Sequence, residues 1–102
     1  SEEGLAGKVL VTGQDADLVA MQRIAAGTQA MTIYKPLHTL AQGAADLAVR
    51  MASGKPVIAR HAVNNGAIDV PSVLFDVVTV TRDNIDSTVV KDGLYRREEI
   101  FQ

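Results

Sequence analysis

The order of apolar and polar positions predicts a strand and then a helix at the start of the chain. Residues 8–12 (KVLVT) contain a short apolar run, which is typical of a strand buried on both faces. Residues 17–26 carry apolar side chains at helical spacing, and Gly27 ends that segment. Between them, Asp15 and Asp17 occupy a polar turn where a carboxylate can accept the N–H groups of a helix N-terminus. N-capping is therefore the first interpretation of both, and it is stronger for Asp17.

A second strand is predicted directly after this helix. Residues 31–34 (MTIY) are β-prone, and Pro36 biases Lys35 towards an extended conformation. Strand, helix and strand in this order predict a β-α-β unit with parallel strands and a right-handed crossover. Asp15 and Lys35 would then lie just past the carboxyl ends of the two strands. Ligands bind at that edge in open α/β sheets, so these two residues are the candidate site.

The middle of the chain predicts a long helix followed by a hairpin or loop. Residues 37–53 carry an apolar stripe at helical spacing, and Gly54 with Pro56 forms a stop signal. Residues 57–63 could form a short strand. The Asn64-Asn65-Gly66 sequence then predicts a tight turn at the surface, because Asn and Gly tolerate positive φ.

The last third predicts a strand, a helix and a charged tail. Residues 72–80 are strongly β-prone, but Asp76 within them indicates a bend or a passage between two structural units. A helix is expected over residues 82–91, with Gly93 after it. The charged tail, residues 94–102, offers two aromatic rings that could dock on a neighbour.

Composition narrows the class of protein. A chain of 102 residues suits one small domain, and a net charge of −2 provides no basic surface for nucleic acid. The chain has no cysteine, so it can form neither a disulfide nor a thiolate zinc site. No apolar run approaches the ~18 residues of a membrane span. The chain starts without an initiator Met or a signal peptide, as a segment of a longer protein would.

The sequence offers little for catalysis. His38 and His61 are the two histidines, and neither is spaced with other ligands in a metal-binding pattern. Gly13 alone lacks the glycine spacing of a dinucleotide loop. We therefore expect no catalytic residue, no metal and no cofactor.

Asp15 and Lys35 together suit a polyol. A carboxylate can accept hydrogen bonds from two adjacent hydroxyls, and an ammonium donates up to three. Such charge-assisted bonds are roughly twice as strong as neutral ones. The alternative, an Asp–Lys ion pair across neighbouring loops, has equal weight from spacing alone.

Several segments resemble the D-xylose-binding periplasmic proteins, which are the solute-binding components of ABC sugar importers. These segments are GQDADL (13–18), AGTQAMTIYKP (26–36), NNG (64–66), DVPSVLFDVVTVTRDNI (69–85) and VVKDG (89–93). The resemblance covers nearly all of the chain and corresponds to the C-terminal portion of such a protein. It implies an α/β type I periplasmic-binding fold of two lobes with parallel sheets flanked by helices.

The resemblance also implies a division of the chain and a site. Residues 1–35 would belong to the C-terminal lobe and end in a hinge crossing, residues 36–75 to the N-terminal lobe, and residues 76–102 to the return crossing and final helix. The sugar-binding aspartate and lysine of the family fall on Asp15 and Lys35. The implied partners are a pentose (D-xylose), an ABC permease and the remaining N-terminal portion of the protein, possibly as a separate chain; the implied location is the periplasm.

Two alternatives keep the fold and change its use. The chain could belong to a sugar-sensing domain of a membrane receptor system, or to the effector domain of a sugar-responsive repressor. A sugar-processing enzyme is a third alternative, with Asp15 as its only candidate acid or base.

Overall fold

The computed structural model describes residues 2–102, which form two compact units. The first unit combines the chain up to Lys35 with Val77–Gln102, and the second unit is Pro36–Asp76. The chain therefore leaves the first unit after Lys35 and returns to it at Val77. Among the described residues, no helix is both long and apolar enough to cross a bilayer.

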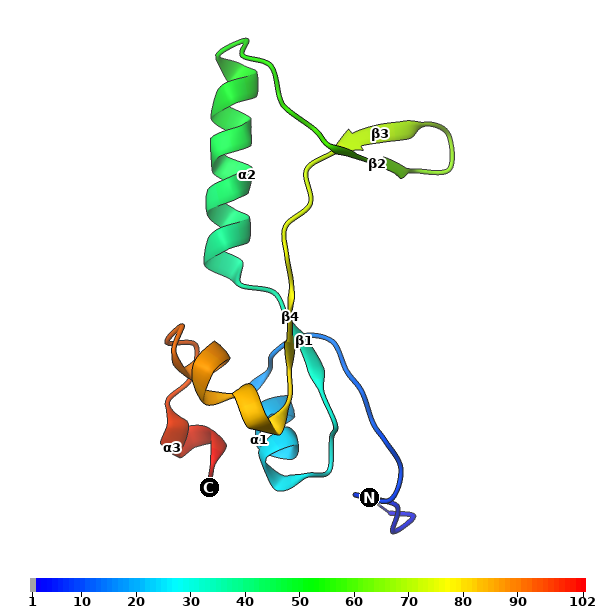
Figure 1. Ribbon diagram of the computed structural model, residues 1–102, viewed down its shortest axis with the longest axis vertical. Coiled ribbons are helices and arrows are strands. Elements are labelled where there is room, and N and C mark those ends of the chain that lie inside the picture. Colours follow the sequence, from blue (N-terminus) through cyan, green and yellow to red (C-terminus); the bar gives the residue numbers. More distant parts are fainter. Residues whose placement is uncertain (1) are drawn as a thin grey trace. The chain divides into compact units, whose positions relative to one another are not determined.

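The first unit contains the elements at both ends of the chain (Figure 1). In order they are α1 (Leu18–Ala26), β1 (Thr32–Tyr34), β4 (Val78–Val80), a 3-10 helix (Arg82–Asn84), a π-helix (Asp86–Val90) and α3 (Arg97–Ile100). Strands β1 and β4 pair antiparallel, with Thr32 opposite Val80 and Tyr34 opposite Val78. Helix α1 ends at Gly27 with φ of 81°, as the sequence predicts, because glycine adopts the left-handed conformation at little cost.

One apolar core holds this unit together. Its buried side chains come from α1, β1, β4 and the C-terminal segment: Met21, Ile24, Ala25, Tyr34, Val80, Ile85, Val89 and Ile100. The amide Nε2 of Gln22 donates to the carbonyl oxygen of Glu99 at 2.8 Å and joins α1 to α3. Tyr95 and Phe101 pack against this core, so the aromatic residues of the tail dock within their own unit.

The predicted buried strand over residues 8–12 is wrong as a regular element. Thr12 forms an isolated parallel bridge with Met31, and Leu10 is 86% exposed. The parallel direction is nevertheless as predicted, since Gly13 N donates to Met31 O and Ile33 N to Gly13 O. A strand buried on both faces needs a neighbour on each edge and cover on both sides. This segment has one such neighbour, so its apolar side chains stay exposed.

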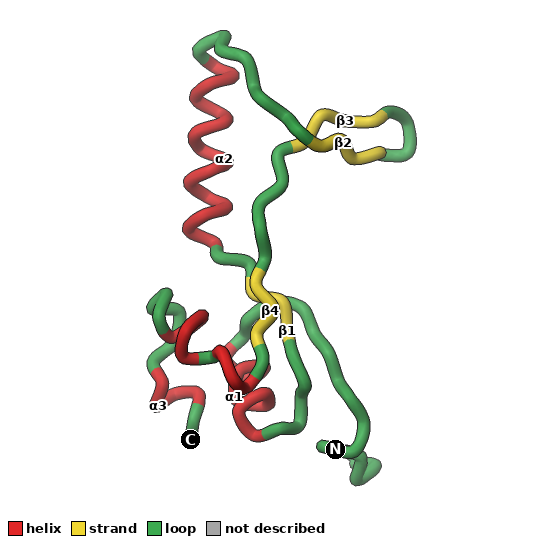
Figure 2. Tube along the Cα trace, viewed as in Figure 1, coloured by secondary structure: helices red, strands yellow, loops and turns green. Residues whose placement is uncertain are grey.

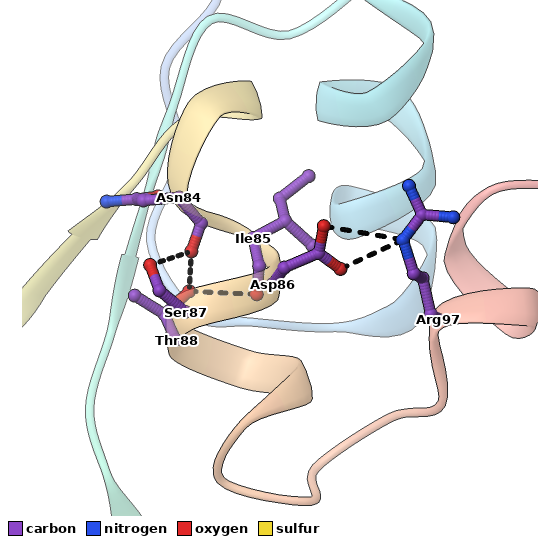
Figure 3. A network of polar contacts seen from close by, with 6 residues as sticks. All are labelled: Asn84, Ile85, Asp86, Ser87, Thr88 and Arg97. Atoms are coloured by element: carbon purple, nitrogen blue, oxygen red, sulfur yellow. Dashed lines mark hydrogen bonds and ion pairs between the residues drawn. The ribbon is translucent and has the colours of Figure 1, made fainter.

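The expected α-helix over residues 82–91 is replaced by a 3-10 turn and a π-helix. The carbonyl oxygen of Asn84 accepts hydrogen bonds from the hydroxyls of Ser87 (3.2 Å) and Thr88 (2.7 Å), as Figure 3 shows. Hydroxyls that bind nearby carbonyls compete with the α-helical ladder. The main-chain bonds shift accordingly to Val90 N–Ile85 O and Lys91 N–Asp86 O, five residues apart. Gly93, with φ of 74°, ends the segment.

The second unit consists of α2 (Leu37–Ala52) and a hairpin of β2 (His61–Asn64) and β3 (Asp69–Ser72) (Figure 1). The hairpin at the Asn-Asn-Gly sequence is as predicted. Asn64 Oδ1 accepts the Gly66 N–H at 2.8 Å, and Asn65 Oδ1 accepts the next two N–H groups. Strand β2 begins at His61, four residues later than the predicted start at residue 57, and extends to Asn64.

The predicted strand over residues 72–80 is interrupted. Strand β3 ends at Ser72 and β4 begins at Val78, and the intervening residues 73–77 are loop (Figure 2). Phe75, in this loop, lies against Gly43 of α2, where an added Cβ would collide with the ring. That contact covers little of the helix, since none of its residues is buried. The apolar stripe of α2 is therefore only partly covered within its unit, at Leu40, Gly43 and Leu47.

Tyr34 gives the first unit a titratable group in its core. Its hydroxyl donates to Asp92 Oδ2 at 3.1 Å. Burial, followed by the hydrogen bond and the negative charge of Asp92, raises the pKa of Tyr34 above its ordinary value of 10.0. The folded state therefore keeps the phenol proton at a pH where the unfolded chain loses it.

We expect this shift to make stability fall in alkali. The contribution of Tyr34 is fully present below pH 10 and is lost as the pH rises from there through the raised pKa. The Tyr34→Phe variant, assembled with the N-terminal portion of the protein, should lose less of its unfolding midpoint between about pH 9 and pH 11 than the parent assembly, as followed by circular dichroism. Tyr95→Phe is the matched control. Equal alkaline losses in Tyr34→Phe and the parent would contradict this assignment.

Candidate sugar-binding site

Asp15 and Lys35 form an ion pair in the first unit. Lys35 Nζ lies 2.8 Å from Asp15 Oδ1, and the two side chains are 36% and 61% exposed, respectively. The sequence predicts that both residues follow the ends of adjacent parallel segments, and the structure brings them together. The ion-pair interpretation and the ligand interpretation are compatible, because the exposed carboxylate and ammonium both remain open to a second partner.

The backbone of Asp15 is held in an unusual conformation. Its φ is 76°, and it is the one non-glycine residue with positive φ among residues 2–102. Asp and Asn enter this left-handed region at lower cost than other side chains, but not without cost. The conformation persists because neighbouring residues fix it.

Three groups of Asp15 each bind one residue of β1 or the residue directly after that strand. Its N–H donates to Ile33 O at 2.9 Å. Its carbonyl oxygen accepts from the Thr32 hydroxyl at 2.7 Å, and its carboxylate pairs with Lys35. Asp15 is thus positioned by a main-chain hydrogen bond to Ile33, by the buried hydroxyl of Thr32 and by the charge of Lys35.

Gly13, two residues before Asp15, is closely packed against neighbouring side chains. A Cβ on Gly13 would lie 2.8 Å from Gln29 Nε2 and 3.4 Å from Thr32 Oγ1. Gln29 is buried and donates to Met31 O at 3.1 Å. A side chain at this position would have to displace the amide group of Gln29, so packing favours glycine here. The dinucleotide-loop interpretation is not needed to explain it.

The other polar candidates have simpler roles. Asp17 occupies the N-cap position of α1 in an extended conformation, and its carbonyl accepts the first helical bond from Met21 N. The predicted capping by its carboxylate is wrong, because this side chain makes no capping hydrogen bond. His38 and His61 are exposed and belong to the second unit. Within residues 2–102, no three His, Cys, Asp or Glu side chains gather in a way that could hold a metal ion.

Sequence reasoning did not single out Thr32. Its side chain is fully buried and shares a face of β1 with Tyr34, since alternate residues of a strand point the same way. A polar side chain at an inward position must find a hydrogen-bond partner. That requirement was the available signal, but only the structure identifies the partner as Asp15.

Comparisons with known proteins identify relatives of the chain. The family profile described as "Periplasmic binding protein domain" matches residues 1–56, which include Asp15 and Lys35. The D-xylose-binding periplasmic protein of Escherichia coli (strain K12) is 49% identical over 100 residues, which are 98% of this chain and 30% of that protein. The protein of the same name from Haemophilus influenzae is 46% identical over 101 residues, which are 99% of this chain and 30% of the relative.

A solved structure extends the comparison to the fold. It is a carbohydrate-transporter solute-binding protein from Chloroflexus aurantiacus in complex with D-glucose. Its TM-score is 0.79 at 41% identity, over 88% of this chain and 26% of that chain. The chain spans about 30% of the length of the curated relatives it matches. On the match of the family profile to more than half of its residues, the chain belongs to the periplasmic binding protein domain family.

Proposed function

We propose that this chain is part of the solute-binding component of an ABC sugar importer, and that Asp15 and Lys35 bind the sugar. The observation that carries the proposal is the exposed, rigidly held carboxylate with an ammonium 2.8 Å away. The protein would act in the periplasm and deliver its ligand to a membrane permease. It would bind and release the sugar without covalent chemistry.

The chemistry of the pair supports a monosaccharide ligand. The Asp15 carboxylate has one oxygen turned to Lys35 and a second oxygen that can accept from ligand hydroxyls. Lys35 retains N–H donors for a hydroxyl or a ring oxygen. Each charge-assisted bond of this kind contributes about 1.5–3 kcal/mol. A ring of adjacent hydroxyls matches such a site better than a flat apolar ligand does.

D-xylose is the proposed ligand. Two relatives that align over nearly the whole chain are named for binding D-xylose. The similar Chloroflexus structure holds D-glucose, so a hexose is the competing ligand to test. Both sugars offer the adjacent hydroxyls that the carboxylate needs.

We also propose a division of the protein into two lobes that close on the sugar. We assign residues 1–35 to the C-terminal lobe and residues 36–75 to the N-terminal lobe. Residues 76–102 would form the return crossing and the final helix, which belongs to the C-terminal lobe. Sugar would be bound between the lobes, and a hinge movement through the crossings would close them. The N-terminal portion of the protein would supply the remaining sugar contacts, either as part of the same polypeptide or as a separate chain. We call that complete assembly the full-length protein.

Calorimetric titration of the full-length protein tests the proposal. We expect saturable heat with D-xylose at one site per molecule and weaker binding of D-glucose. Xylitol, which lacks the ring, is the control ligand and should bind poorly. The recovered sugar should be chemically unchanged. Absence of heat with both pentose and hexose would contradict the proposed function, and conversion of the sugar would support an enzyme instead.

A further inference from the structure

We propose that Thr32 is a positioning residue that holds Asp15 in its left-handed conformation and thereby places the carboxylate for the ligand. The sugar-binding part of this inference rests on the proposed function. Thr32 does not reach the exposed site itself, because its side chain is fully buried. It acts through the carbonyl oxygen of Asp15, to which its hydroxyl donates at 2.7 Å.

The need for such a residue follows from the conformation of Asp15. A φ of 76° costs free energy in any residue with a Cβ, so the chain would relax to negative φ if nothing opposed it. Relaxation would rotate the peptide groups on both sides of Asp15. The carboxylate would then move relative to Lys35, whose own position is set by β1.

Two main-chain groups of Asp15 resist this relaxation. The N–H is fixed by Ile33 O, which is itself part of β1. The carbonyl oxygen is fixed by the Thr32 hydroxyl, so the residue is fastened on both sides of its Cα. The N–H bond follows from the parallel pairing of the chain. The carbonyl bond depends on one side chain, which makes it the part that a substitution can remove.

Because Thr32 is buried, its hydroxyl is held in the direction of the Asp15 carbonyl oxygen. Threonine is restricted at χ1, and here its side chain is enclosed by the unit's core, so the hydroxyl cannot turn to water. Loss of the hydroxyl leaves the Asp15 carbonyl without its partner, while the rest of β1 keeps its pairing with β4. Threonine and valine have nearly the same shape, so Thr32→Val removes the bond with little change in packing.

The first test is a double-mutant cycle in the full-length protein. Thr32→Val should raise the Kd for D-xylose by roughly two- to tenfold. Thr32→Ser, which keeps the hydroxyl, should restore most of the affinity. In an Asp15→Asn background, Thr32→Val should cause no further loss, because its effect passes through the Asp15 carboxylate. Thr79→Val, the same change at an exposed position of β4, is the control.

The second test measures the backbone conformation of Asp15 in the absence of sugar. The three-bond coupling between its amide and α protons depends on φ, and it should change in Thr32→Val and not in Thr32→Ser or Thr79→Val. Thr32→Cys, a weaker donor of similar volume, replaces Thr32→Val if that variant does not fold. An unchanged coupling in the variant without the hydroxyl overturns the inference. A changed coupling together with an Asp15→Asn variant of normal affinity would leave the positioning role standing and overturn the proposed function instead.

Discussion

Replacing Asp15 with asparagine is expected to weaken D-xylose binding by the full-length protein by roughly 10- to 100-fold. The substitution keeps the shape of the side chain and suits the left-handed conformation, since Asn enters it as readily as Asp. It removes the negative charge that strengthens bonds from sugar hydroxyls. The affinity loss should therefore come from the ligand and not from a change of backbone.

Stability distinguishes the binding role from a simple ion pair. An exposed pair such as Asp15–Lys35 contributes only about 0–1 kcal/mol to folding. Asp15→Asn should therefore change the unfolding midpoint little while it weakens binding strongly. Lys35→Met, which keeps the aliphatic stem and removes the ammonium, should behave in the same way.

Calorimetry with D-xylose and thermal unfolding of each variant are the two measurements. Asp83→Asn is the matched control, because it makes the same chemical change at an exposed position of the first unit. Its affinity should equal that of the parent. If Asp15→Asn and Lys35→Met bind D-xylose as tightly as the parent does, the pair is structural only and the assigned site is wrong.

The isolated 102-residue chain is expected to lack a cooperative unfolding transition and to self-associate. Each unit leaves apolar surface without a partner. In the first unit, Val9, Leu10 and Val11 are about half exposed or more. In the second unit, α2 buries none of its residues, and Leu37, Val49 and Met51 are each about two-thirds exposed. Soluble proteins rarely expose apolar surface of this extent.

Size-exclusion chromatography and circular dichroism of the isolated chain give the result directly. The N-terminal portion, added as a separate chain, should produce a complex with a sharp melting transition and sugar binding. Ligand binding should then raise the midpoint further, since D-xylose binds only the folded assembly. A compact monomer of the chain alone that melts cooperatively would falsify the proposal that the N-terminal portion completes the fold.

Local signals predicted those elements that depend on few residues. Gly27 ends α1 and the Asn-Asn-Gly sequence forms a hairpin, because both outcomes follow from positive φ at particular positions. Residues 8–12 were predicted as a buried strand because burial was inferred from apolar character. Burial depends on neighbours from elsewhere, which a local pattern does not reveal. The predicted α-helix over residues 82–91 was wrong for a different reason. The hydroxyls of Ser87 and Thr88 donate hydrogen bonds to the carbonyl oxygen of Asn84.

The candidate site was predictable in outline and not in detail. Parallel topology alone places the ends of two segments side by side, and this was enough to pair Asp15 with Lys35. The left-handed φ of Asp15 and the bond from Thr32 were not predictable. Both depend on the exact path of the turn between residues 13 and 17, where aspartate is ordinarily explained as a helix cap.

The pairing of Tyr34 with Val78 has a consequence for engineering the molecule. The chain leaves the first unit after Lys35, which is one residue beyond Tyr34. It returns at Val77, one residue before Val78. Paired residues of antiparallel strands lie only about 5 Å apart, so the whole second unit is an insertion between two points that nearly touch. An Asn-Gly turn between Lys35 and Val77 could replace it and close a hairpin. The topology thus offers a route to a shortened protein that carries Asp15, Thr32 and Lys35 on one continuous unit.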